Sequence, residues 1–308
     1  MSDQTIDTAV DAGLEAAVEP VTGAAALQRR PWLGVLKQAL RMGRTRIGLA
    51  IVALIIAIAV LGPLVSPYSP TEFVAAPNSG PSADALFGAD ALGRDVFSRF
   101  LNGGLSVLWM AAAATLIGVV AGVIIGLLAA YSRGWLDDVL MRASDVVLAF
   151  PQIILALLAV SALGPKPWLI VLVVAVTHAP RVARVIRGAA LEVVERDFVK
   201  AAEVVGEKRS RILFGEVLPN VTSPLLVELG LRMTYSIALV AAVSFLGFGL
   251  QPPAADWGLM INENRLSITV QPWSVLLPVL AIGLLTVGTN LVTDGIARAA
   301  IGIDRSAR

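Results

Sequence analysis

Residues 197–220 read DFVKAAEVVGEKRSRILFGEVLPN and form a charged island between two long apolar runs. Because charged side chains are costly in hydrocarbon, the island is expected to lie outside a membrane that the flanking runs cross. Its pattern predicts a short helix, a turn at Gly206, a second short helix and a stop at Pro219-Asn220. Such a segment would be a rigid element suited to docking on another protein.

Six apolar runs around this island are long enough to cross a bilayer. A spanning helix needs about 20 apolar residues, because each residue rises about 1.5 Å through a hydrocarbon layer roughly 30 Å thick. The runs cover approximately 47–66, 105–130, 139–163, 168–186, 222–250 and 274–297. With 56% hydrophobic residues and a mean hydropathy of +0.78, the chain is predicted to be an all-α polytopic membrane protein with six transmembrane helices.

The distribution of Lys and Arg predicts how these helices are oriented. Nineteen of the 24 Lys and Arg residues fall on the side of the two termini and the charged island, and four fall on the opposite side. By the positive-inside rule, both termini are expected in the cytoplasm. Residues 1–46 would then form a cytoplasmic tail, residues 67–102 an extracytoplasmic segment, and residues 298–308 a second cytoplasmic tail. The acidic first part of the first tail is expected to be disordered, with a helix that docks on a basic surface as the alternative.

Three further features carry expectations about the connections and the third span. Residues 87–99 combine apolar side chains with charges of both signs, which is typical of a helix lying on the membrane surface. Trp257 and Trp273 flank a later connection, and both indoles are expected at the membrane interface. Phe150-Pro151 is expected to bend the third span, because a proline removes one backbone hydrogen bond.

Two groups of residues within the spans suggest contacts between helices. Gly118, Gly122 and Gly126 recur every fourth residue, so we expect another helix to pack closely against this face. Glu228 and Arg232 are one helical turn apart and can pair with each other. Contact of these two charges with a partner subunit or with cargo also stays open, since charged groups inside membranes are often functional.

The sequence contains no signature of catalysis. It lacks a phosphate-binding Gly-Lys-Ser/Thr loop, so the chain is not expected to hydrolyse ATP, and it lacks a nucleophile elbow and a zinc-peptidase motif. It has no Cys and one His, His178, which leaves no Cys- or His-based metal site. We therefore predict no catalytic and no metal-binding residues. Two alternatives fit less well, because an ion-coupled transporter would show more intramembrane carboxylates and an internal repeat, and a membrane-embedded enzyme would show a nucleophile or base.

Short sequence blocks along most of the chain carry a resemblance to a known family. They are Leu92-Gly93-Arg94-Asp95 with Phe97-Ser98-Arg99, Asp145 with Phe150-Pro151, Ala183-Arg184 with Arg187-Gly188, the charged island, Ser244-Phe245-Leu246-Gly247, Gln251-Pro252-Pro253 with Trp257-Gly258, and Asp294-Gly295. In order and spacing they resemble permease subunits of the dipeptide/oligopeptide (OppC/DppC) group of ABC importers. The resemblance implies a type I ABC importer (MetI-like) transmembrane fold, in which one extra span at 47–66 precedes a five-helix core at 103–297.

In this family the charged island corresponds to the EAA loop, which seats in the ATPase subunit. The resemblance thus implies a cytoplasmic coupling loop over residues 188–220. Its expected coupling residues are Asp197, Val199, Lys200, Ala201, Ala202, Gly206, Ile212, Leu218 and Pro219. A stiff lever can transmit displacement between proteins, and the small Ala201 and Ala202 allow close approach to a groove. Lys200 stands where many loops of the family have Glu, which reverses one charge of the docking surface.

The resemblance also implies what the chain works with. The expected partners are a second homologous permease in a heterodimer, two ABC ATPase subunits or domains that carry ATP and Mg²⁺, an extracytoplasmic solute-binding protein, and the lipids of a bacterial inner membrane. No cofactor is expected on this chain itself, and no nucleic acid. Di- and oligopeptides are the expected cargo, and nickel chelates, glutathione, haem and other small molecules stay open as alternatives.

Overall fold

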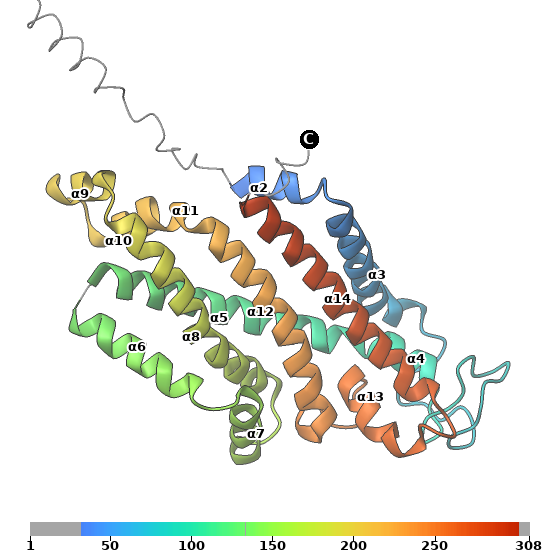
Figure 1. Ribbon diagram of the computed structural model, residues 1–308. Coiled ribbons are helices and arrows are strands. Elements are labelled where there is room, and N and C mark those ends of the chain that lie inside the picture. The colour runs from blue at the N-terminus through green and yellow to red at the C-terminus, as the bar shows by residue number, and fades with distance from the viewer. Residues whose placement is uncertain (1–31, 133, 302–308) are drawn as a thin grey trace, which may run out of the picture. The chain divides into compact units, whose positions relative to one another are not determined.

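The computed structural model describes residues 32–132 and 134–301, which fold into packed helices (Figure 1). The elements are α2 (Trp32–Ala39), α3 (Gly43–Val65), α4 (Val96–Asn102), α5 (Gly104–Ser132), α6 (Trp135–Leu148), α7 (Gln152–Leu163), α8 (Pro167–Val194), α9 (Asp197–Val204), α10 (Arg209–Arg211), the π-helix η1 (Ile212–Val217), α11 (Leu218–Asn220), α12 (Thr222–Val243), the π-helix η2 (Ser244–Phe248), α13 (Trp257–Asn264), the 3₁₀-helix η3 (Arg265–Ser267) and α14 (Trp273–Ile301). Within these two ranges the only β structure is two isolated bridges, so the all-α prediction is confirmed. Helix α2 was not expected, and the predicted disorder of the acidic first residues lies outside the described part.

In the described part of the chain, five helical stretches are long and apolar enough to cross a membrane. They are Gly43–Val65, Val96–Ser132, Pro167–Val194, Thr222–Phe248 and Trp273–Ala300. These stretches match five of the six predicted runs. At the remaining run, 139–163, two shorter helices are bent by 82° and together have the length and composition of a sixth span.

Pro151 explains the bend between these two helices. α6 ends at Leu148, and Pro151 directly precedes α7. A proline has no N–H to donate and disfavours helical conformation in the residue before it, so the hydrogen-bond ladder of α6 cannot continue past Phe150. The bend was predicted, and its size of 82° divides the third predicted run into two helices.

The glycines of α5 lie against α8 and permit its close approach. A Cβ atom built on Gly122 would lie 2.5 Å from Val182 Cβ and 2.6 Å from the Ala179 carbonyl oxygen. Cβ atoms on Gly118 and Gly126 would meet carbonyl oxygens of α8 at 2.8 and 2.6 Å. Since real Cβ atoms do not approach other atoms this closely, any other residue at these positions would force the two helices apart.

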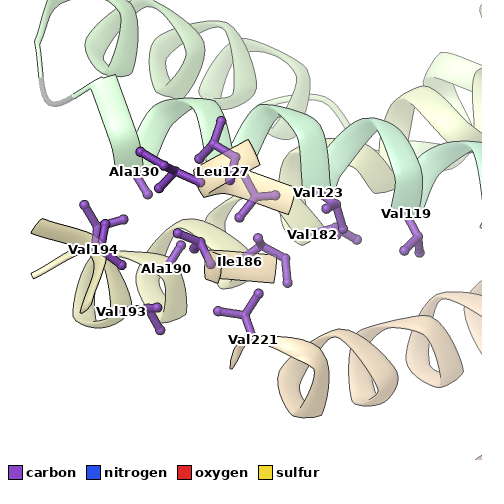
Figure 2. Close-up of a cluster of buried hydrophobic side chains, with 14 residues drawn as sticks. Val119, Val123, Leu127, Ala130, Val182, Ile186, Ala190, Val193, Val194 and Val221 are labelled. Carbon is purple, nitrogen blue, oxygen red and sulfur yellow. The ribbon is translucent and has the colours of Figure 1, made fainter. Parts of the chain in front are cut away.

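Apolar side chains continue the contact between α5 and α8 into a core that also includes the following loop. We call this core the loop-side cluster; Figure 2 shows the side chains of α5 and α8 facing each other within it. Its buried members are Val119, Val123, Leu127, Ala130, Val182, Ile186, Ala190, Val193, Val194, Val199, Ile212, Leu213, Val217 and Val221. The loop after α8 is therefore part of the same hydrophobic core as the two helices.

A second core lies toward the other end of α5, and we call it the outer cluster. Its buried members are Ile55, Ala59, Phe100, Leu101, Val107, Ala111, Ile237, Trp257, Met260, Ala281 and Leu285. These residues come from α3, α4, α5, α12, α13 and α14. The outer cluster therefore joins the first span to the core helices.

Trp257 lies inside the outer cluster, so its predicted place at the membrane interface was wrong. Its side chain is 0% exposed, and its indole N–H donates a hydrogen bond of 2.9 Å to the carbonyl oxygen of Phe100. The two rings are stacked with centroids 5.7 Å apart. A buried indole needs a partner for its N–H, and Phe100 supplies it.

The segment 87–99 also differs from the surface helix that we expected. It is irregular as far as Asp95, and helix begins only at Val96. Gly88 and Gly93 have φ angles of +76° and +84°, in the left-handed region that interrupts a right-handed helix. Arg99 is 0% exposed, so the charges of this segment are directed into the protein.

Replacing Gly122 with leucine should separate α5 from α8. We expect the free energy of unfolding to fall by about 1–3 kcal/mol or more, because there is no space for the added side chain. Thermal unfolding of the purified chain in detergent would measure it. Val120→Leu is the matched control, because Val120 is 48% exposed; equal losses in both variants would show that the glycine face has no packing role.

Candidate functional site

The segment from Glu195 to Asn220, which we call the α8–α12 loop, has the order of elements predicted from its sequence. α9 is followed by a turn at Gly206, and α10, η1 and α11 then form a second helical stretch. Only Val221, with φ −107° and ψ 13°, separates α11 from α12. The loop is therefore short helix, turn, short helix, with a break one residue after the predicted stop.

Gly206 ends α9 in the left-handed conformation, with φ +84°. The N–H of Gly206 donates to the carbonyl oxygen of Glu203 at 3.0 Å, and the N–H of Glu207 donates to that of Ala202 at 3.0 Å. This pair of bonds is the Schellman motif, which satisfies the last carbonyl groups of a helix. A Cβ on Gly206 would meet nothing within 4 Å, so glycine is required here for its φ angle and not for space.

Three of the predicted coupling residues anchor the loop. Val199 and Ile212 are 0% and 1% exposed and belong to the loop-side cluster with α5 and α8. Leu218 is half-buried against the same cluster. Any movement of α9 or η1 away from α5 and α8 would expose these side chains to water, so the loop moves with those helices.

The other face of the loop carries an open groove of ≈ 280 Å³. It is lined by Ala201, Ala202, Val205, Glu207, Arg211, Ile212 and Glu216. Arg211 Nε lies 3.4 Å from Glu207 Oε2. Because exposed ion pairs contribute little to stability, these charges are free to act in recognition. The predicted Ala201 and Ala202 thus line a depression with a charged rim.

The three other predicted coupling residues lie at the surface. Asp197 begins α9, where a negative charge is favourable at the helix N-terminus. Lys200 Nζ lies 3.4 Å from Glu195 Oε2, and both side chains are more than half exposed, at 56% and 57%. Pro219 is exposed in the first turn of α11, where proline is tolerated.

Sequence reasoning missed three exposed apolar side chains on this loop. Val204, Val205 and Phe214 are 88%, 82% and 51% exposed. Their signal in the sequence was weak: large apolar residues that directly precede a glycine turn or interrupt a charged stretch. Exposed apolar groups on an ordered loop are typical of a protein–protein contact. The loop therefore offers a rigid, partly apolar docking face.

Ion pairs fix α6 to the end of α8 from which the loop emerges. Arg187 donates to both carboxylate oxygens of Asp137, at 2.6 and 2.5 Å. Arg184 of α8 pairs with Asp145 of α6. A two-pronged arginine–carboxylate contact is strong and directional, so α6 belongs to the framework that positions the loop.

The two intramembrane charges lie together on α12. Arg232 Nε is 3.1 Å from Glu228 Oε2, and the two side chains are 7% and 9% exposed. Within the described residues neither of these atoms has a hydrogen-bond partner. The guanidinium of Arg232 also lies 5.2 Å from the centre of the Tyr235 ring. Charge attraction and a cation–π contact therefore hold Arg232 in place.

Neutralising either member of this pair should destabilise the protein. Glu228→Gln or Arg232→Gln leaves an uncompensated buried charge, which costs about 3–5 kcal/mol. The exchange Glu228→Arg/Arg232→Glu should recover part of the loss in thermal unfolding of the purified chain. Strictly additive damage in this double-mutant cycle would mean that the two groups do not interact.

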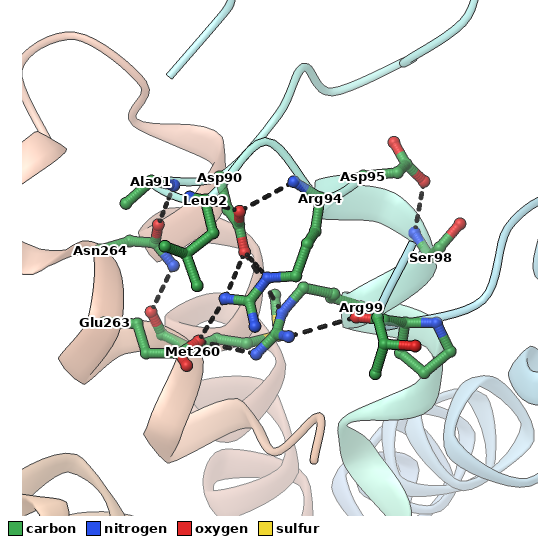
Figure 3. Close-up of polar contacts among 12 residues, drawn as sticks. Asp90, Ala91, Leu92, Arg94, Asp95, Ser98, Arg99, Met260, Glu263 and Asn264 are labelled. Atoms are coloured by element: carbon green, nitrogen blue, oxygen red, sulfur yellow. Dashed lines mark hydrogen bonds and ion pairs between the residues drawn. The ribbon is translucent and has the colours of Figure 1, made fainter. Parts of the chain in front are cut away.

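A second buried set of charges connects the segment before α4 with α13 (Figure 3). Arg94 lies 2.7 Å from Asp90 and 2.9 Å from Glu263. Arg99 of α4 lies 2.7 Å from Glu263 and 3.4 Å from Asp90. Two arginines and two carboxylates thus balance each other's charges. Arg99 and Asp90 are almost wholly shielded from water, at 0% and 1% exposure. We call these four residues the buried ion network.

Asp256 makes a further buried junction between helices. Its carboxylate accepts hydrogen bonds from Ser106 Oγ of α5, at 2.5 Å, and from Ser244 Oγ of η2. It also accepts a bond of 3.0 Å from the backbone N–H of Leu259, which caps α13. The start of α5, η2 and α13 are therefore held at one buried carboxylate.

Two family models match the chain. Residues 118–301 match the binding-protein-dependent transport system inner membrane component. Residues 31–81 match the N-terminal TM domain of oligopeptide transport permease C. The first match runs from the glycine face of α5 to the end of α14 and includes the whole α8–α12 loop, and the second covers α2 and α3.

Individual relatives agree with these matches. The dipeptide transport system permease protein DppC of Alkalihalophilus pseudofirmus is 35% identical over 267 residues, which are 86% of this chain and 88% of the relative. The glutathione transport system permease protein GsiD of Pectobacterium atrosepticum is 36% identical over 270 residues, or 87% and 90% of the two chains. Among solved structures, an amino acid ABC transporter crystallised with histidines shares the fold, with a TM-score of 0.50 at 20% identity over 65% of this chain and 93% of that one. This chain therefore belongs to the family of binding-protein-dependent transport system inner membrane components.

Proposed function

We propose that the chain is the transmembrane permease subunit of an ATP-driven ABC importer for di- and oligopeptides in a bacterial inner membrane. The observation that carries the cargo assignment is the identity of 35% and 36% to permeases named for dipeptides and for glutathione. Glutathione is itself a tripeptide, so both names describe short peptides. This supports peptides, with glutathione as the second candidate, over nickel chelates or haem. A second, homologous permease would complete the translocation pathway.

In this proposal the α8–α12 loop is the contact with the ATPase subunits, which bind ATP and Mg²⁺ and carry out hydrolysis. Three observations support it: the loop is anchored on α5 and α8 through Val199 and Ile212, it has a groove lined by small alanines, and it exposes Val204 and Val205. A partner that binds two conformations of this face with different affinity can shift the permease between two states. This chain then acts as a mechanical and not a catalytic subunit.

The opposite face would receive cargo from an extracytoplasmic binding protein. Its segment between α3 and α4 is fixed to α13 by the buried ion network. A firmly held surface lowers the entropic cost of docking. We infer that this side of the bundle, away from the α8–α12 loop, is the docking side.

Transport by the reconstituted complex tests the function. The chain would be purified with its neighbouring permease, ATPase and binding protein and placed in vesicles with labelled dipeptide. We expect uptake of the labelled dipeptide to require ATP and every subunit, and excess unlabelled dipeptide to compete with it. Stronger competition by glutathione than by dipeptide would favour glutathione as the cargo. Uptake driven by a proton or sodium gradient without ATP would contradict the proposal.

Cysteine labelling tests the proposed orientation, with both termini in the cytoplasm. The chain has no native Cys, so single Cys residues can be placed at the exposed positions Ser82, Thr269 and Ser210. An impermeant maleimide added to intact spheroplasts should label the first two and reach Ser210→Cys only after lysis. Labelling of Ser210→Cys in intact spheroplasts would show that the orientation is the opposite of the one proposed.

A further inference from the structure

Helix α2 is held firmly at the end of α14. The proposed transport function does not explain why this helix is fixed there. Val35 and Ala39 are both 0% exposed and pack against Ala299, with Ile296 and Met42 beside them. Figure 1 shows α2 beside the end of α14 and the start of α3. α2 is therefore a fixed part of the bundle.

The face of α2 that remains uncovered is apolar. Leu33, Leu36 and Leu40 are 59%, 37% and 43% exposed. Leu33 and Leu36 lie on one side of α2, and Leu40, in the turn directly after the helix, continues this side, because its N–H donates to the Leu36 carbonyl oxygen at 2.9 Å. No described part of the chain covers these leucines fully, so the helix presents an apolar strip next to the face that packs on α14.

A basic strip lies beside the leucines. Lys37 is exposed on the side of the leucine strip that faces away from Val35 and Ala39. Arg41, in the turn after α2, is also exposed. Arg46 is also exposed, and its Nε donates to the carbonyl oxygen of Leu40 at 3.1 Å. Between Glu19 and Glu72 the sequence has no acidic residue. This part of the chain is thus positive, and Asp294 of α14 lies 3.7 Å from Arg44 at its edge.

The position of α2 relative to the membrane follows from the chain itself. α3, whose exposed side chains are apolar from Ile47 onward, begins at Gly43, only a few residues after α2 ends at Ala39. A connection this short keeps the end of α2 within about 14 Å of the start of α3. This places α2 near the level of the lipid headgroups.

We propose that α2 and its basic residues form a binding surface for phosphate-bearing anionic phospholipids. Leu33, Leu36 and Leu40 insert at the boundary between headgroups and acyl chains, and Lys37 and Arg41 contact the lipid phosphates. An apolar face flanked by Lys and Arg is the pattern of helices that lie in this interface. Each basic side chain near an anionic membrane strengthens binding. The inference is independent of the cargo and of the ATPase partner.

Spin labels on the full-length chain test the proposal. A nitroxide on Leu36→Cys reports on the leucine strip, and one on the exposed Gly34→Cys reports on the water-facing side. The labelled chains are placed in nanodiscs of phosphatidylcholine alone or mixed with phosphatidylglycerol, and accessibility to oxygen and to a water-soluble nickel chelate is measured. We expect the Leu36→Cys label to be protected from nickel in the mixed lipid, and the Gly34→Cys label to be accessible in both.

Removing the charges should weaken the contact of the leucine strip with the anionic membrane. In Lys37→Gln/Arg41→Gln the ratio of protected to exposed label should fall about fivefold for each removed charge at low salt. Lys166→Gln/Arg265→Gln removes the same charge from exposed positions elsewhere and should have no effect. A misfolded variant would be recognised by a broadened size-exclusion profile of the nanodiscs, so loss of protection in a monodisperse sample reports on lipid binding.

Three results would overturn the proposal. Nickel access at Leu36→Cys equal to that at Gly34→Cys in the mixed lipid would mean that the strip does not enter the membrane. Protection that is equal in both lipids and unchanged by Lys37→Gln/Arg41→Gln would mean that anionic headgroups are not bound. Protection that disappears when Asp3, Asp7, Asp11, Glu15 and Glu19 are changed to their amides would identify the acidic segment of the chain itself as the occupant.

Discussion

Replacing Gly206 with valine should uncouple ATP hydrolysis from transport while leaving the spans folded. Gly206 has φ +84°, a conformation that a β-branched residue reaches only at a cost of about 1–2 kcal/mol or more. The Schellman turn would open, and the population of the docking conformation would fall roughly 5- to 30-fold. Because nothing lies within 4 Å of the added Cβ, the strain stays in the loop and does not spread into the core.

The measurement is substrate uptake per ATP hydrolysed by the reconstituted complex, together with the amount of ATPase that co-purifies. Gly206→Asn is the matched control, since asparagine tolerates the left-handed conformation and should retain most coupling. Ala202→Asp should have the same effect as Gly206→Val by a different route, because it puts a carboxylate into a groove that already contains Glu207 and Glu216. Ala202→Ser should be mild. Normal uptake and assembly in Gly206→Val and Ala202→Asp would remove the coupling role from this loop.

Replacing Arg99 with leucine should destabilise the protein by about 3–5 kcal/mol, the cost of leaving buried charge without its partner. Arg99 is 0% exposed and lies 2.7 Å from Glu263 and 3.4 Å from Asp90. After the substitution, Arg94 alone would face both carboxylates. The expected result is a large drop in the yield of folded protein and in its unfolding temperature.

Two variants make this prediction specific. Arg265→Leu removes an exposed arginine of the same region and should be nearly neutral. Arg99→Lys keeps the charge but loses the fork of donors, one of which reaches the Pro70 carbonyl oxygen at 3.2 Å, so it should recover only part of the stability. Arg99→Leu with wild-type stability would show that the network does not hold these segments together.

The spans and the form of the loop could be predicted from the sequence because local rules determine them. An apolar run of sufficient length has to form a spanning helix, and the ends of α12 and α14 nearest the loop and the outer connection lie within one residue of the predicted limits, at Thr222 and Trp273. Pro151 and Gly206 act on their own backbone, so the bend and the turn were also readable. The angle of the bend could not be predicted, because it depends on what α7 packs against and not on the local sequence.

The errors concern contacts between distant parts of the chain. Arg99 was expected near the membrane surface because its partner Glu263 is 164 residues away in sequence. Trp257 was expected at the interface because its hydrogen-bond acceptor, on Phe100, is 157 residues away. Val204 and Val205 were not singled out, since exposure of an apolar residue depends on which side of α9 faces the core. Periodicity shows that a side chain is apolar or charged but not which distant partner it meets.

α5 contributes side chains to both the loop-side cluster and the outer cluster, and this has a consequence for how movements at the two faces of the membrane are coupled. Its later residues belong to the loop-side cluster, whereas Val107 and Ala111 belong to the outer cluster and Ser106 bonds to Asp256. With 29 residues, α5 is a stiff rod about 43 Å long. If the loop end of the rod tilts one way about the middle of the bilayer, the Ser106 end swings the other way. Opening at one face and closing at the other are then a single motion of one helix, with no relay of side chains required between them.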